Sequence, residues 1–157
     1  MLIVFPLGLL ATAVIFDVIF LIWGNPTFAT VAYWMIVAGI ISGFIAAPFG
    51  TIDWLAIPSG TRAKSVGLWH GVGNVLVLLL FIGSWWLRYG STSPTVHAPG
   101  ALALILSFAG AGISLLTAWR GGELVDRLAV GVDDGAHLNS PHSLAGRPAD
   151  ENAERSV

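Results

Sequence analysis

The chain has 157 residues, of which 55% are hydrophobic and only 10% are charged. Soluble globular domains carry about 25% charged residues, so this composition indicates a membrane protein. The formal net charge of −2 and the lack of cysteine exclude a basic nucleic-acid-binding surface, disulfides, thiolate metal sites and covalently attached c-type haem.

Four long apolar runs make up most of the first 120 residues. They cover residues 2–23, 28–49, 66–87 and 98–119, and each forms about 33 Å of helix. A hydrocarbon core is about 30 Å thick, so each run is long enough to cross it once. None shows the period-2 alternation of a membrane β-barrel strand. The sequence therefore predicts an all-α fold, a four-helix transmembrane bundle.

Polar connections separate these runs. The first, residues 24–27, reads Gly-Asn-Pro-Thr and predicts a tight turn between antiparallel helices. The second, residues 50–65, is longer and charged, and the third, residues 88–97, begins with Arg88. We therefore expect one membrane domain, residues 1–132, made of two hairpins. Residues 133–157 are polar without apolar periodicity, which predicts a disordered cytosolic tail.

Basic residues are unequally distributed about the spans. Only Arg88 flanks one side, whereas the other side receives Arg62, Lys64, Arg120 and Arg127. Positively charged flanks remain in the cytoplasm. Both termini are therefore expected to be cytoplasmic.

Small residues recur along two of the predicted helices. They are Gly39, Gly43 and Ala47 in the second helix, and Gly100, Ala103, Ser107, Gly110, Ala111 and Ser114 in the fourth. Small side chains let membrane helices approach closely. These stripes predict tight helix packing, either within one bundle or between subunits.

Asp17 is the one formally charged residue within a predicted span. A carboxyl group there costs a few kcal/mol and is a candidate functional site. The alternative, which we favour, is a protonated or hydrogen-bonded carboxyl that joins helices. Ser84 and Ser107 lie at comparable depth and are its candidate partners.

His70 and Asn74 are one helical turn apart in the third span, in the string GLWHGVGNVL. Helical projection puts both on one face with Gly67, Val77, Phe81 and Ser84, and this face should point into the bundle. Asp17 should lie roughly 18 Å from His70 along the bundle, too far for direct contact.

Charged residues close to His70 in the expected bundle suggest its partners. Asp53 follows the second span, and Arg120 and Glu123 follow the fourth. With His70 and Asn74 they form a predicted polar cluster. We favour a structural lock, in which Asp53 or a backbone carbonyl satisfies the imidazole and joins the second and third helices.

A cofactor site is the alternative interpretation of His70 and Asn74. Four-helix membrane bundles often hold haem b between inward histidines, and a quinone could lie between Trp69 and Trp119. His70 is the one histidine within a predicted span, since His97 lies in a connection and His137 and His142 lie in the tail. Bis-histidine ligation within one chain is therefore not expected, and no metal site is predicted.

Several motifs together resemble one known family. They are FPLGLL and FD in the first span, G-x-x-D-W-L-x-I-P-x-G-T-R-A-K in the second connection, H-x-x-x-N in the third span and GGELV after the fourth. Over about residues 3–132 the chain resembles DUF2231, a bacterial four-helix membrane family of unknown function. The resemblance implies the bacterial plasma (inner) membrane. Related domains fused to Rieske-type or cytochrome modules imply, by analogy, an association with membrane electron transfer.

The resemblance also suggests which polar residues matter. The family's polar positions fall on Asp17, Asp53, His70, Asn74 and Glu123. Many members continue after GGELV with Tyr-x-His-Gly-Val-Gly-Val, where this chain reads DRLAVGV. A second candidate ligand histidine is therefore missing.

Three functions follow from these observations. A non-enzymatic accessory or scaffold subunit fits best, because the sequence shows no nucleophile–base pair and no set of metal ligands. The second is an electron-transfer module that binds haem b or quinone near His70. The third is a small proton-coupled transporter that uses Asp17 on one side and Asp53 with His70 on the other. The expected partners are the lipid bilayer and either a second copy or a membrane redox complex.

Overall fold

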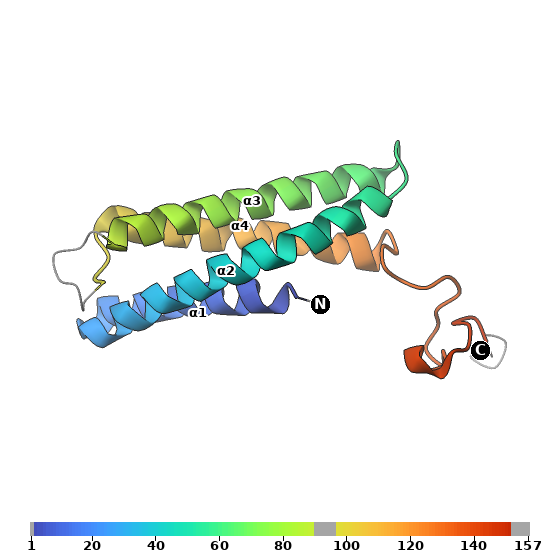
Figure 1. Cartoon of the computed structure of the whole chain (residues 1–157), viewed down its shortest axis with the longest axis horizontal. Helices are drawn as coiled ribbons and strands as arrows, with labels where there is room; N and C mark the ends of the chain where they lie inside the picture. The colour runs from blue at the N-terminus through green and yellow to red at the C-terminus, as the bar shows by residue number, and fades with distance from the viewer. Residues whose placement is uncertain (1, 90–96, 152–157) are drawn as a thin grey trace.

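The computed structural model describes residues 2–89 and 97–151, and these contain four long helices and no strand (Figure 1). The helices are α1 (Val4–Trp23), α2 (Pro26–Ala56), α3 (Arg62–Tyr89) and α4 (Ala101–Asp126), followed by the short 3-10 helix η1 (Ser143–Ala145). All four long helices are apolar and long enough to cross a membrane. The predicted all-α four-helix bundle is confirmed.

The bundle has two distinct ends (Figure 1). At the first, which we call the hairpin end, α1 turns into α2, α3 ends and α4 begins. At the second, the termini end, α1 begins, α2 is connected to α3, and α4 ends. The turn at the hairpin end is set by Asn25, whose side chain accepts a hydrogen bond from the Thr27 amide, and by Pro26 in the first helical position.

Three helices extend further at the termini end than the hydropathy pattern predicts. The predicted connection 50–65 is helical except at residues 57–61, and α4 continues to Asp126. A charged residue ends an apolar run in the sequence, but a helix ends only where its backbone geometry cannot continue. Here α2 and α3 are interrupted at Pro58 and at Gly60, which has φ +79°.

The short α1 makes the bundle uneven. It has 20 residues, whereas α2 has 31 and α3 has 28. Since these helices start or finish near the same hairpin end, α2, α3 and α4 continue past the start of α1 at the termini end (Figure 1). The hairpin half therefore contains four helices, and the last turns of the termini half contain three.

Glycine allows close contact inside each hairpin and between them. A side chain at Gly39 would overlap Leu10, and one at Gly43 would overlap Leu78. The core at the middle of the bundle consists of Leu10, Ala13, Ile36, Val77 and Phe81. α1 packs mainly on α2, and α3 mainly on α4. These small-residue positions thus pack within one chain, which the sequence left open.

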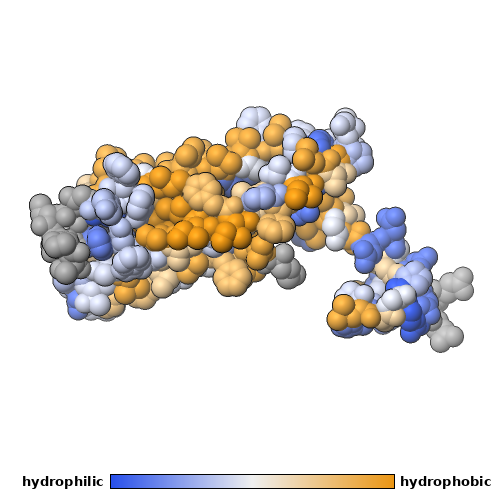
Figure 2. All heavy atoms as spheres, viewed as in Figure 1, coloured by the Kyte–Doolittle hydropathy of each residue, from blue (hydrophilic) through white to orange (hydrophobic). Residues whose placement is uncertain are grey.

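The outer surface of the bundle is largely apolar, and hydrophilic atoms gather towards its ends and on the tail (Figure 2). The described part of the tail contains turns and η1, so its predicted disorder stays a prediction. There Arg147 Nε donates to Glu151 Oε2 at 2.6 Å, and this hydrogen bond lowers the pKa of Glu151 from its ordinary value.

Candidate functional site

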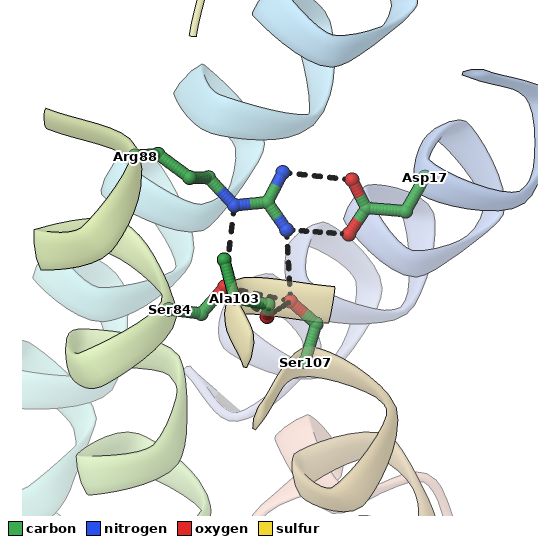
Figure 3. Close-up of polar contacts among 5 residues, drawn as sticks. All are labelled: Asp17, Ser84, Arg88, Ala103 and Ser107. Carbon is green, nitrogen blue, oxygen red and sulfur yellow. Dashed lines mark hydrogen bonds and ion pairs between the residues drawn. The ribbon is translucent and has the colours of Figure 1, made fainter. Parts of the chain in front are cut away.

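A buried ion pair joins the two hairpins near the hairpin end (Figure 3). Arg88 Nη1 and Nη2 each donate to one carboxylate oxygen of Asp17, both at 2.7 Å. Both side chains are 0% exposed. In this bidentate geometry the two charges neutralise each other, and the paired hydrogen bonds fix the orientation of both side chains. We call this ion pair, with Ser84 and Ser107, the Asp17–Arg88 cluster.

Two serines complete the coordination of the guanidinium. Arg88 Nε donates to Ser84 Oγ at 3.2 Å, and Nη2 donates to Ser107 Oγ at 2.9 Å. The two hydroxyls lie 2.8 Å apart, and both reach the carbonyl of Ala103. Their two protons suffice for the Ala103 carbonyl and the contact between the serines, whichever hydroxyl donates to which. Together with the two bonds to Asp17, these contacts satisfy four of the five N–H groups of Arg88 inside the protein.

Helix geometry explains how a terminal arginine reaches this depth. Arg88 lies in the last turn of α3, one residue before its end. Side chains in a helix tilt towards its N-terminus, so a long side chain there extends back along the bundle. Its guanidinium consequently lies level with Ser84, one turn earlier, and meets Asp17 about 9 Å below the end of α1.

This geometry corrects two expectations. Arg88 was placed in the third connection as a flanking charge, but it belongs to α3 and is buried. The serines were expected to hold Asp17, but the hydrogen bonds of that carboxylate come from Arg88, and the serines bind Arg88 instead. The signal was available: among the lysines and arginines of residues 2–89 and 97–151, only Arg88 lies near the end of the bundle that holds Asp17.

The second polar cluster lies in the termini half, between α3 and α4. His70 Nδ1 is 2.8 Å from the carbonyl oxygen of Thr117, and Asn74 Nδ2 is 2.9 Å from His70 Nε2. We call these three residues the His70 cluster. A carbonyl only accepts, so Nδ1 carries the proton. In the neutral ring Nε2 then accepts from the amide of Asn74.

Two glycines allow this contact between helices. A side chain at Gly73 of α3 would overlap the methyl group of Thr117, and a Cβ at Gly121 of α4 would lie 3.0 Å from His70 Cε1. The backbones can therefore approach closely enough for an imidazole to bond a main-chain carbonyl. The cluster joins α3 to α4, not α3 to α2 as expected.

The other residues of the predicted polar cluster lie elsewhere. Asp53 and Arg120 are exposed on the outer turns of α2 and α4. Glu123 is in α4, where it forms an ion pair with Arg62 at the start of α3. The structure thus brings together His70 and Asn74, and gives His70 the Thr117 carbonyl as partner in place of Asp53.

A third set of contacts connects α2 to α3. Lys64 Nζ donates to the carbonyls of Trp54 and Leu55 at 2.7 and 3.3 Å, and it lies 4.1 Å from the centre of the Trp54 ring. The indole of Trp54 in turn donates to the Lys64 carbonyl at 3.0 Å. A cation at the last turn of a helix binds the carbonyl oxygens there and interacts favourably with the negative end of the helix dipole. This lock fixes the connection 57–61.

At the hairpin end, the ring of His97 stacks on Tyr33 of α2. The ring centres are 3.7 Å apart and the planes differ by 13°. From the sequence, His97 was expected in the third connection, and no contact partner was predicted for it. The stacking ties the segment before α4 to the first hairpin.

The comparisons with known proteins agree with this architecture. A family model described as "Predicted membrane protein (DUF2231)" matches residues 1–134. The chain belongs to the DUF2231 family. No curated protein and no solved structure matches it. Membership of DUF2231 therefore supports the membrane location and leaves the activity to be inferred from the polar clusters.

Proposed function

We propose that this DUF2231 protein is a non-enzymatic accessory or scaffold subunit of the bacterial inner membrane. One observation supports this most directly: the ionisable side chains inside the spans serve as bonds between helices. Asp17 and Arg88 bind each other across the two hairpins, and both ring nitrogens of His70 bind groups of α3 and α4. Groups held in this way specify one packing of the bundle.

The same geometry bears on the electron-transfer alternative. A haem iron would bind the Nε2 lone pair of His70, but that lone pair accepts the hydrogen bond from Asn74. In the described part of the chain no three His, Asp or Glu side chains lie close enough to hold a metal ion. The residues around His70 thus fit haem poorly in this arrangement. We therefore propose that His70 serves to bond α3 to α4.

The test removes the ionisable imidazole of His70 while keeping its hydrogen bonds between the helices. His70→Gln supplies a carboxamide with N–H donors and an oxygen acceptor, so it should keep the contacts to the Thr117 carbonyl and the Asn74 amide. In a strain that lacks the chain, we expect expression of His70→Gln to complement any defect in growth or in assembly of a membrane complex as well as the natural chain does. His70→Leu, which offers neither group, is the matched control and should lower the amount of folded protein. Loss of function in His70→Gln at normal abundance would contradict the proposal.

We also propose that the termini end faces the cytoplasm. Arg62, Lys64, Arg120 and Arg127 lie at this end. Arg88, the one basic residue counted on the other side, is buried inside the bundle. The basic residues that flank the spans therefore lie at the termini end, which the positive-inside rule assigns to the cytoplasm.

Since the natural chain lacks cysteine, single substitutions can report this orientation. Thr27→Cys lies at the hairpin end and Ser59→Cys in the connection at the termini end, and both positions are exposed. In intact cells a membrane-impermeant maleimide should label Thr27→Cys, and Ser59→Cys only after permeabilisation. The reverse pattern would place both termini outside.

A further inference from the structure

Asn74 is partly exposed, although it lies near the middle of a membrane span. It is about 18 Å from the first residue of α3 and about 22 Å from the last, at 1.5 Å per residue. One of its N–H groups binds His70. Within residues 2–89 and 97–151, no group donates a hydrogen bond to its Oδ1. A carboxamide oxygen without a partner in hydrocarbon is costly, so its surroundings need an explanation.

Asn74 points into the bundle rather than towards lipid. At about 100° per residue it lies in the same direction as Phe81, Val77 and Gly67, all of which are buried. The lipid-facing side of α3 is about 140° away at Leu79, which is 58% exposed. Exposure of Asn74 therefore means that the interior of the bundle is open at its level.

This opening is closed on the side of the hairpin end. The side chains of the Asp17–Arg88 cluster and Phe81 close the interior towards the hairpin end, with Phe81 1% exposed and the ion pair 0%. Towards the termini end α1 stops, while α2, α3 and α4 continue (Figure 1). Hydrophilic atoms also extend into the apolar middle of the surface from that end (Figure 2).

We propose that water enters the bundle from the termini end and reaches Asn74, and that the core around Phe81 and the Asp17–Arg88 cluster close this inlet. Water supplies the donor that Asn74 Oδ1 lacks. The inlet would also make the His70 cluster a polar site that water reaches inside the membrane. The inlet follows from exposure and helix length, and does not depend on the proposed accessory role.

Cysteine reactivity tests the inlet, because only the thiolate reacts with a charged methanethiosulfonate and thiolates form in water. Asn74→Cys is the primary variant. Ser114→Cys, on the adjoining turn of α4, is the second if Asn74→Cys fails to fold. In nanodiscs both should react within about 10-fold of Ser59→Cys. Leu79→Cys, on the lipid face of the same helix, should react about 100-fold more slowly.

Sidedness completes the test. In intact cells the charged reagent should modify Asn74→Cys only from the side that modifies Ser59→Cys, whichever side that is. Reactivity as low as that of Leu79→Cys in both inlet variants would overturn the proposal. A disulfide between two copies of Asn74→Cys would also overturn it, because a second copy would then cover the amide.

Discussion

Replacing either Asp17 or Arg88 alone is expected to lower the free energy of unfolding by about 3–5 kcal/mol, because each change leaves an unpaired group in a dry interior. Suitable single variants are Asp17→Leu and Arg88→Met. The double variant should recover most of this loss, since two apolar side chains need no partner. Ser84 and Ser107 remain satisfied in it by each other and by the Ala103 carbonyl.

The measurement is unfolding in mixed micelles, followed by circular dichroism, for the natural chain, both single variants and the double variant. The resulting cycle should give a coupling energy above about 2 kcal/mol between the two residues. A double variant as unstable as the sum of the single variants would show that the pair does not join the hairpins. Arg62→Met, which removes an exposed ion-pair partner, is the control and should change stability by less than about 1 kcal/mol.

The second large effect is expected at Gly110, where α4 contacts α3. A Cβ there would lie 2.8 Å from Cε2 of Phe81 and 3.6 Å from Cβ of Leu80. Phe81 is 1% exposed and belongs to the core, so the methyl group added in Gly110→Ala should force the helices apart. Overpacking costs about 1–3 kcal/mol. Alanine favours helix by about 1 kcal/mol over glycine, so the net loss should be at most about 2 kcal/mol.

Gly112→Ala is the matched control for Gly110→Ala. It lies two residues further along the same helix, and a Cβ there meets nothing within 4 Å. It should therefore leave the free energy of unfolding unchanged or raise it by up to about 1 kcal/mol. A loss in Gly110→Ala no larger than the change in Gly112→Ala would show that contact with Phe81 does not control the effect.

The Asp17–Arg88 cycle also bears on the transport alternative. A proton-coupled transporter that uses Asp17 would need this carboxyl to exchange protons, whereas the structure holds it in an ion pair without exposure. A stable double variant provides the material for the test. Proton flux in proteoliposomes that persists in that variant would show that Asp17 carries no protons.

Much of the architecture followed from local patterns. Four apolar runs of membrane length predicted the four helices, and the 3.6-residue period predicted the inward face of α3, where Gly67, Val77, Phe81 and Ser84 are buried. The limits of the spans and the helical rise also predicted that Asp17 and His70 lie far apart along the bundle, and in the structure they belong to separate clusters. These properties depend on residues close together in the chain, so the sequence by itself determined them.

Other features were decided only by tertiary structure. Arg88 was excluded from its span because a charge ends a hydropathy run, yet its long side chain extends back to Asp17, 71 residues away. The partner of His70 is a main-chain carbonyl, which every residue possesses and which no sequence pattern marks. Its position depends on how closely Gly73 and Gly121 let α3 approach α4. Hydrogen-bond partners across helices depend on distances between backbones, and those distances are set only when all four helices pack together.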